Sequence, residues 1–314
     1  MRVFDGHTDA ILRCYQRGGT MRKTAGHLDF ERMAANGHSA QFFACFWDTA
    51  ETPARAAYTI FREQVTLFQK QMAENSDLIT QCRTADEVEA AWTAGRQAAL
   101  LSVEGAELLD CDLGKLEEAY ELGVRAVNLT WNHRNPLSGT NVENPDRGLT
   151  DKGKTFAKRM LELGMLIDVS HLSDPGFWDV YQLSRETKKP FFASHSNSRV
   201  ICPHTRNLTD EQFTAIMEVG GVAGINMHPP FLGENPDLDT VIRHTEHWFG
   251  LGGEANVSLG GDWDGISHTP RGVSGIQDLP KLADRLLQLN YKEEQVDGLF
   301  WKNLMRVVKN VCTM

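Results

Sequence analysis

Short apolar segments alternate with longer segments of helical period along the whole chain. Each apolar segment is followed by a small or polar residue, as in AALLSV and VAGIN. Because these segments are apolar almost throughout rather than at every second position, they are typical of parallel strands covered on both faces. We count eight of them, at residues 2–5, 40–46, 98–103, 126–130, 166–169, 191–193, 222–226 and 257–260.

Helix-capping signals lie in the gaps between these segments. Asp174 followed by Pro175 predicts a helix start with Asp174 as the cap, and Thr209 with Gln212 predicts a capping box. No Pro, Gly or Ser-rich linker and no repeat of fixed period divides the chain. Eight strand–helix units in 314 residues therefore predict an α/β fold, a single (β/α)8 TIM barrel spanning residues 1–314.

The amino-acid composition makes some classes of binding partner unfavourable. The chain has 32 Lys and Arg against 42 Asp and Glu, so its net charge of -10 disfavours binding to nucleic acid or to an anionic membrane. It opens MRVFDGHTDA, without the basic and apolar regions of a signal peptide, and we expect a cytoplasmic location. The six cysteines have no CxxC spacing, so we expect small buried residues rather than disulfides, zinc thiolates or a nucleophile.

One motif matches a nucleotide-binding pattern by its letters alone. Residues 148–155 read GLTDKGKT, with Lys154 and Thr155 in the phosphate and magnesium positions of a P-loop. A P-loop needs a buried strand directly before its glycines, whereas NVENPDRG precedes these. We therefore predict that Thr150 caps an ordinary helix and that the lysines lie on its solvated face.

Polar side chains follow several of the predicted strands, at the end of a barrel where active sites are built. Imidazoles and carboxylates without thiolates suit zinc or another first-row divalent ion, and their number exceeds one tetrahedral site. Two metal ions sharing a bridging carboxylate account for the number, as in metal-dependent hydrolases. The residues are His7, Asp9, Glu104, His171, His195, Asp262 and Asp264. By contrast, we interpret His244 and His247 as the solvated face of a helix.

Together the motifs resemble one known family. The runs FDGHTDAI, SVEGAELL, GVRAVNLTWNHRN, GMLIDVSHLSD, FFASHSNSR, HTRNLTDEQ, LGGDWDG and NLMRV are similar to the membrane dipeptidase (renal dipeptidase) family of zinc peptidases. The resemblance spans nearly the whole chain and implies a (β/α)8 barrel that holds two Zn²⁺ ions and cleaves dipeptides. Carried over by motif, His7 and Asp9 hold one zinc, His171 and His195 hold the other, and Glu104 bridges them.

The resemblance also implies roles in proton transfer and substrate binding. Asp262 in GDWDG handles the proton, and spacing alone leaves Asp264 open as an alternative. Arg206 in HTRN receives the free carboxylate of the dipeptide, a task that suits a guanidinium fork. We add His228 as a second substrate-binding candidate.

The chain departs from the family at one position. Animal members have LTH at the end of the fourth strand, where the histidine is thought to stabilise the oxyanion, whereas this chain has Leu129, Thr130 and Trp131. We name His133, two positions later, as the catalytic candidate that takes over. Oxyanion stabilisation and substrate preference are left open here.

The expected function is that of a binuclear zinc dipeptidase with a small-molecule dipeptide substrate, including dipeptides with a carboxyl-terminal D-residue. Two alternatives remain: another metal-dependent amidohydrolase or lactonase on the same barrel, and a non-catalytic binding protein with a vestigial site. Many barrels of the first kind bridge their metals with a modified lysine, and no predicted strand end offers one. A homodimer is left open.

Overall fold

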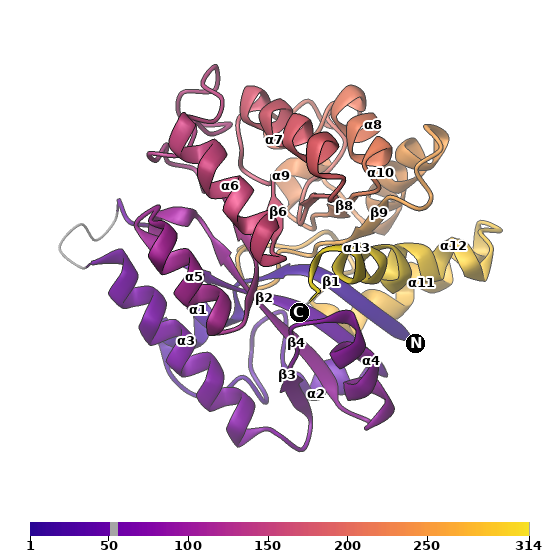
Figure 1. Ribbon diagram of the computed structural model, residues 1–314. Helices are drawn as coiled ribbons and strands as arrows, with labels where there is room; N and C mark the ends of the chain where they lie inside the picture. Colours follow the sequence, from indigo (N-terminus) through magenta and orange to yellow (C-terminus); the bar gives the residue numbers. More distant parts are fainter. Residues whose placement is uncertain (51–55, 314) are drawn as a thin grey trace.

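The computed structural model describes residues 1–50 and 56–313, which fold into a closed parallel barrel surrounded by helices (Figure 1). The prediction of a (β/α)8 barrel is confirmed. Eight strands form the ring, and pairing of β2 with β4 closes it. Each predicted segment corresponds to one of these strands, which are β1 Arg2–Thr8, β2 His38–Phe46, β4 Gln97–Glu104, β5 Val124–Asn128, β6 Leu166–Asp168, β7 Phe192–Ala193, β8 Val222–Ile225 and β9 Val257–Leu259.

A further strand, β3 Ile79–Gln81, was not predicted. It pairs with the first residues of β4, where Ile79 lies opposite Gln97, while β5 pairs with the later residues of β4. Only Ile79 of its three residues is buried, so the segment carries no apolar run that a pattern could detect. β3 thus extends the sheet beside the ring.

Helices cover the outside of the ring, and each return to the next strand passes through at least one of them (Figure 1). Short 3₁₀ turns, η1 Ala106–Leu109 and η2 Ile276–Asp278, and a π-helical turn, η3 Gly298–Lys302, interrupt the pattern. The helices are α1 Ala10–Arg17, α2 Phe30–Ala35, α3 Ala57–Glu74, α4 Ala85–Thr93, α5 Leu113–Glu121, α6 Asp151–Leu163, α7 Asp174–Thr187, α8 Asp210–Glu218, α9 Pro229–Leu232, α10 Leu238–Gly250, α11 Leu279–Gln288, α12 Glu293–Asp297 and α13 Asn303–Val311. None of the helices that the structure describes combines the length and apolar character needed to cross a bilayer.

The capping predictions are confirmed with one correction. Thr209 and Gln212 form the capping box of α8, and Thr150 caps α6 by accepting from the Gly153 amide, so GLTDKGKT is a helix start rather than a P-loop. The cap of α7 is Ser173, not Asp174. The Ser173 hydroxyl accepts from the Gly176 amide, whereas the Asp174 carboxylate is engaged by the guanidinium of Arg199.

The prediction of a solvated face at His244 is wrong. This imidazole is fully buried on α10, where Nδ1 accepts from the Ser198 amide at 3.1 Å and Nε2 donates to the Leu232 carbonyl at 3.0 Å. Only His247 is partly exposed, and it pairs with Asp210. A helical period alone does not reveal that α10 packs its His244 face beneath the loops that follow β7 and β8.

Successive side chains of the strands enter two separate apolar clusters, as the alternation of a strand requires. On β2, Phe42 belongs to one cluster and Phe43 to the other. The Phe42 ring lies 5.8 Å from those of Phe4 and Phe192, on two other strands of the ring. Leu304 of α13 joins the Phe42 cluster, and this helix crosses the centre of Figure 1.

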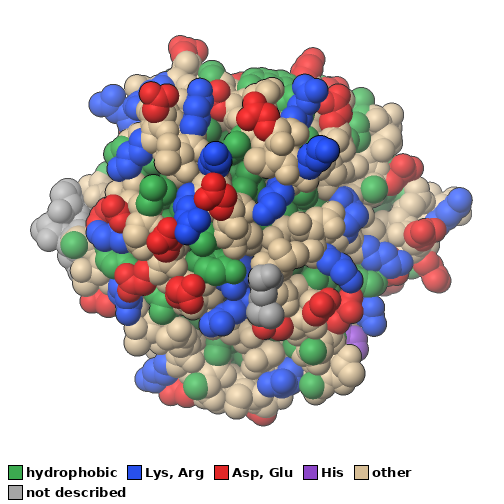
Figure 2. Space-filling model, in the orientation of Figure 1, with side chains coloured by type: hydrophobic (Ala, Val, Ile, Leu, Met, Phe, Trp, Pro, Cys, Tyr) green, Lys and Arg blue, Asp and Glu red, His purple; other side chains and the backbone are tan. Residues whose placement is uncertain are grey.

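The remaining composition predictions concern the cysteines and the surface. All six cysteines are buried and free, as predicted for small apolar residues. Acidic and basic side chains are interspersed over the face drawn in Figure 2, with no continuous patch of either sign.

Truncation of Phe42 should destabilise the barrel strongly. Its ring is fully buried between Phe4 and Phe192, so Phe42→Ala should lower the free energy of unfolding by about 3–5 kcal/mol, through lost burial and the cavity that remains. Chemical denaturation measures the change. Val142→Ala, at a side chain that is 60% exposed, is the control and should have almost no effect. Equal stabilities of the two variants would contradict this account of the core.

Candidate metal centre and active site

Six of the side chains singled out by the sequence meet at the carboxyl ends of the strands. His7 is the second-last residue of β1, and Asp9 follows β1 directly. Glu104 is the last residue of β4. The other three lie in the segments that follow β6, β7 and β9, and they are His171, His195 and Asp262. The barrel therefore gathers one site from residues that span most of the chain.

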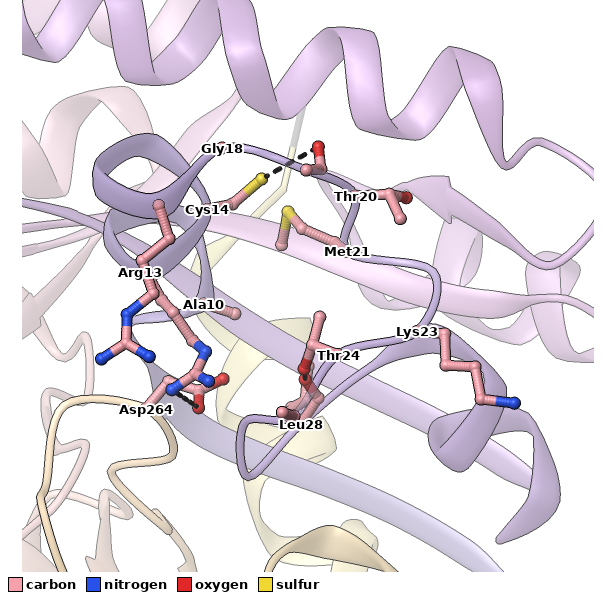
Figure 3. A pocket seen from close by; sticks show the side chains of 13 residues that line it. Ala10, Arg13, Cys14, Gly18, Thr20, Met21, Lys23, Thr24, Leu28 and Asp264 are labelled. Carbon is pink, nitrogen blue, oxygen red and sulfur yellow. Dashed lines mark hydrogen bonds and ion pairs between the residues drawn. The ribbon is translucent and has the colours of Figure 1, made fainter.

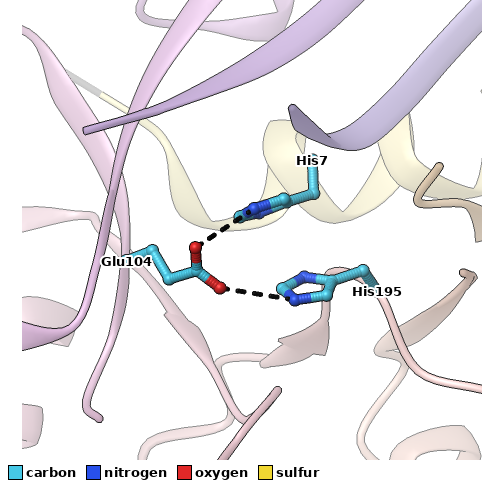
Figure 4. Close-up of side chains that lie close together, drawn as sticks. All are labelled: His7, Glu104 and His195. Carbon is cyan, nitrogen blue, oxygen red and sulfur yellow. Dashed lines mark ion pairs between the residues drawn. The ribbon is translucent and has the colours of Figure 1, made fainter. Parts of the chain in front are cut away.

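Glu104 lies at the centre of this site and faces imidazoles with both carboxylate oxygens. Its Oε2 is 3.4 Å from Nε2 of His7, whereas its Oε1 is 3.1 Å from Nε2 of His171 and 3.4 Å from Nε2 of His195. Figure 4 shows the carboxylate facing both rings, with one oxygen directed at His7 and the other at His195. One carboxylate thus contacts three imidazoles.

Two further carboxylates lie on the His7 side. Asp9 Oδ2 is 3.3 Å from His7 Nε2, and the ligand atoms of His7, Asp9 and Asp262 all lie within 4.8 Å of one another. The same limit holds for His7, Glu104 and His195. Asp262 is thus close enough to be a ligand as well as a proton carrier.

Hydrogen bonds behind the imidazoles fix their orientation. His171 Nδ1 lies 2.9 Å from Oδ1 of Asn132, and because a carbonyl oxygen only accepts, Nδ1 carries the proton and Nε2 presents a lone pair to the site. His195 Nδ1 lies 2.6 Å from the Ser194 hydroxyl. Such contacts commonly orient metal-ligating histidines.

Burial and neighbouring charges shift the pKa values of the histidines and of Glu104 at this site in different directions. Burial lowers the pKa values of His171 and His195 well below the usual range, and nearby positive charge acts in the same direction, so both rings are neutral. Burial opposes a charge on His7, but Glu104 and Asp9 raise its pKa well above the usual value. Burial also raises the pKa of Glu104 to about 7, against the effect of His7. The carboxylates therefore require compensation by a proton or a cation.

This donor set fits divalent metal ions such as zinc. Neutral imidazoles and carboxylates without thiolates are typical zinc ligands. In the described part of the chain, His7 Nε2 and Asp9 Oδ1 are buried without a hydrogen-bond partner. The Nε2 atoms of His171 and His195 lie 3.1 Å apart, an approach of two ring nitrogens that a shared cation would stabilise.

Arg206 lies beside the cluster, on the segment between β7 and α8. Its Nη1 donates to Ser196 Oγ at 2.8 Å, but Nε and Nη2 are buried and find no hydrogen-bond partner among the described residues. Burial lowers its pKa to about 10, although Asp262 and Glu104 oppose the shift, so the guanidinium stays charged at neutral pH. Two nitrogens of this charged guanidinium are thus left without an acceptor among the described residues.

His228 and a residue that the sequence analysis missed, His204, lie near this arginine. Their rings are 4.7 and 4.6 Å from that of Phe231, and the Arg206 guanidinium lies 5.8 Å from the same ring. His228 Nδ1 is buried with no hydrogen-bond partner among the described residues. His204 stands two residues before Arg206 in HTRN, and its Nδ1 accepts from the Arg206 amide. The position of His204 two residues before Arg206 could have pointed to it in the sequence.

Two other candidates lie apart from the ligand cluster. His133 is partly exposed and pairs with Glu143 at 2.8 Å and with Asp48 at 3.4 Å, and its catalytic role stays a prediction. Its ring is 5.5 Å from that of Trp131, which in turn lies 6.2 Å from that of His171. Asp264 accepts from the His27 amide and faces Arg13 rather than the imidazoles.

Buried polar residues behind the site were also missed. Asp5 accepts from the amides of His7 and Gly261 and from the indole of Trp263, which ties the end of β1 to the segment after β9. Asn226 donates to Asp262 Oδ2 at 3.0 Å. Asp5 could have been noticed as the residue two positions before His7 in FDGHTD, because alternate residues of a strand share a face.

Comparison with known proteins places the chain in a family. The family model described as membrane dipeptidase (peptidase family M19) matches residues 1–314. An uncharacterized protein in the pqqA 5′ region of Klebsiella pneumoniae is 34% identical over 264 residues, 80% of this chain and 96% of that protein. An uncharacterized dipeptidase of Schizosaccharomyces pombe is 30% identical over 305 residues, 90% of this chain and 72% of that protein.

Solved structures agree with this assignment. A metallo peptidase from Rhodobacter sphaeroides, liganded with a phosphinate mimic of the dipeptide L-Ala-D-Ala, superposes with a TM-score of 0.89. It is 27% identical, and the match covers 99% of each chain. The fold and the match over all residues lead to one conclusion: this chain belongs to the membrane dipeptidase family, peptidase family M19, and is a hydrolase of the metallopeptidase class.

Proposed function

We propose that the chain is a binuclear zinc dipeptidase. The observation that carries the proposal is the position of Glu104, which offers one oxygen to His7 and the other to His171 and His195. In this proposal His7 and Asp9 would hold one zinc ion, His171 and His195 would hold the other, and Glu104 would be shared between them. A pair of zinc ions, when bound, supplies a water of lowered pKa and polarises the scissile carbonyl.

Arg206 recognises the free carboxylate of the dipeptide. Its Nε and Nη2 form the two-pronged donor set that matches a carboxylate, and neither has a hydrogen-bond partner among the described residues. Because Arg206 is held by Ser196 at Nη1, the fork stays aimed while substrate binds. His228, whose buried Nδ1 also lacks a partner in the described chain, is the second contact.

Dipeptides with a carboxyl-terminal D-residue belong to the proposed substrate class. Support comes from the ligand of the Rhodobacter sphaeroides protein, a mimic of L-Ala-D-Ala, together with the similarity of the two chains over nearly their whole length. A cytoplasmic location and a homodimer remain predictions.

Asp262 moves the proton in this mechanism. Asn226 occupies Oδ2 of Asp262, which leaves Oδ1 to take a proton from the attacking water and return it to the leaving amine. Burial raises the pKa of Asp262, although His7 opposes the shift, and a raised pKa makes the carboxyl a better general acid. Asp264 lies beyond Trp263 and faces Arg13, so it is not assigned this role.

The metal content of the protein tests the binuclear site. After reconstitution with zinc, the purified protein should contain about two equivalents per chain, because the ligands exceed the four that one tetrahedral ion needs. His171→Ala should lower this to about one, as measured by elemental analysis. His247→Ala removes a partly exposed imidazole on α10 and should leave the zinc content unchanged. If the protein contains no metal even after reconstitution, the proposal of a binuclear site is wrong.

Substitution of Arg206 tests recognition of the carboxylate. Arg206→Met should reduce transition-state binding by roughly 2–5 kcal/mol, because the ion pair forms in a desolvated site. The loss, measured as kcat/KM, should be larger for dipeptides than for their carboxyl-terminal amides, which carry no charge there. Arg206→Lys, which keeps the charge without the fork, should recover part of the loss. Equal losses on both substrates would assign Arg206 a structural role instead.

Asp262→Asn separates proton transfer from metal binding. The amide is nearly isosteric, so both zinc ions and the fold should be retained while kcat falls by about 10²-fold or more, because an amide cannot carry the proton at neutral pH. Elemental analysis and steady-state kinetics on the same preparation measure the two effects. Full zinc content with unchanged kcat would contradict the role of Asp262 as proton carrier. Loss of zinc would indicate that Asp262 is a metal ligand.

A further inference from the structure

Two aromatic side chains lie at the barrel mouth beside the candidate metal ligands and have no role in the proposed reaction. Phe46 is the last residue of β2, and Trp131 lies three residues after the end of β5. Their rings are 4.8 Å apart at an angle of 54°, and both side chains are partly exposed. We call this pair of residues the aromatic wall.

The register of the strands directs the aromatic wall into the mouth. Phe46 lies opposite Glu104 in the parallel pairing of β2 with β4, and paired residues of neighbouring strands project from the same face of a sheet. Phe46 therefore projects to the side on which Glu104 meets the imidazoles. The Trp131 ring lies on this side as well, 6.2 Å from the ring of His171.

The aromatic wall and Arg206 lie across the barrel mouth from each other. The ring runs from β2 through β1, β9 and β8 to β7, and in the other direction through β4, β5 and β6 to the same strand. β2 and β7 are thus opposite one another, and Arg206 lies on the segment that follows β7. A dipeptide with its carboxylate at Arg206 and its peptide bond at the candidate metal ligands would extend its amino-terminal residue toward the aromatic wall.

Neighbouring contacts hold Trp131 in place. The next residue, Asn132, accepts from His171 Nδ1 at 2.9 Å through its side-chain oxygen. His133 packs edge-on against the indole, with the ring centroids 5.5 Å apart, and is itself paired with Glu143 at 2.8 Å. The indole of Trp131 is therefore a fixed and partly exposed apolar surface.

We propose that the aromatic wall is the subsite for the side chain of the amino-terminal residue of the dipeptide and that it selects large apolar side chains. This inference rests on the proposed dipeptidase function. Aromatic rings offer a large and rigid apolar surface, so a leucine side chain is removed from water when it binds there, whereas glycine has no side chain to bury. Trp131 thus determines specificity by contact with the substrate side chain.

The cavity next to α1 does not offer an equivalent subsite. Its volume is about 310 Å³, and its described lining includes none of the five candidate metal ligands. At one end Arg13 is paired with Asp264, as Figure 3 shows, and the Asp264 side chain is only 1% exposed. These two charged groups are therefore engaged with each other rather than with a substrate.

Dipeptides that differ only in their amino-terminal residue test the proposal. The zinc-reconstituted protein should hydrolyse L-Leu-D-Ala with a kcat/KM about tenfold or more above that for Gly-D-Ala, because only leucine is buried against the aromatic wall. Trp131→Ala should remove most of this ratio, whereas Trp131→Phe, which keeps an aromatic face, should retain most of it. In the slow Asp262→Asn background, calorimetric titration with the same dipeptides should show the same pattern in the ratio of Kd values.

Trp178→Ala is the matched control. This indole lies on α7 and is 40% exposed, so its removal should leave the ratio between the two dipeptides unchanged. Preference at the carboxyl-terminal residue, measured with Gly-D-Leu and Gly-D-Ala, should be the same in Trp131→Ala as in the unsubstituted protein, because Arg206 lies across the mouth. Elemental analysis of each variant measures whether zinc is retained.

The outcomes separate this inference from the function on which it rests. An unchanged ratio in Trp131→Ala, or equal losses on L-Leu-D-Ala and Gly-D-Ala, would overturn the subsite and leave the dipeptidase function standing. A change of preference at the carboxyl-terminal residue alone would also overturn it. If the zinc-loaded unsubstituted protein hydrolyses no dipeptide, the proposed function is wrong, and the subsite with it.

Discussion

The barrel mouth depends on the buried carboxylate of Glu104. Burial raises its pKa to about 7, and the two oxygens face His7 on one side and His171 and His195 on the other. A buried charge is stable only when it is paired, so every neighbouring group is constrained to supply or to hold positive charge. The raised pKa of His7 follows from this requirement, because Glu104 and Asp9 stabilise its charged form, whereas burial keeps His171 and His195 neutral.

A layer of hydrogen bonds behind the ligands keeps this arrangement in place. Asn132 and Ser194 contact the Nδ1 atoms of His171 and His195, and Asn226 holds Asp262. His171 itself has a φ of 70°, an unusual conformation for a residue with a side chain. Strain of this kind persists only where surrounding contacts determine the conformation, and the Asn132 contact is one of them. The barrel thus holds the candidate ligands in place, with His7 and Glu104 on strands and the others on the segments that follow strands.

The ring of strands and the convergence of the polar residues at the strand ends could be predicted because both follow local rules. Continuous apolar runs mark strands buried on both faces, and the residue after each run lies at one end of the barrel. β3 lacked such a run, since only Ile79 is buried there. His244 was misjudged because its burial depends on Ser198 and Leu232, which are distant in the sequence. The spacing of apolar and polar residues along a helix does not reveal contacts of this kind between distant segments.

The GDWDG segment places its two aspartates in different surroundings. Trp263 is fully buried, and its indole donates to Asp5, which also accepts from the amides of His7 and Gly261. Asp5 therefore fixes the end of β1 and the start of this segment together. Because Trp263 is anchored inside, the aspartates on either side of it project to different surroundings, Asp262 to the ligands and Asp264 to Arg13. One anchored indole thus places two carboxylates of different chemistry back to back.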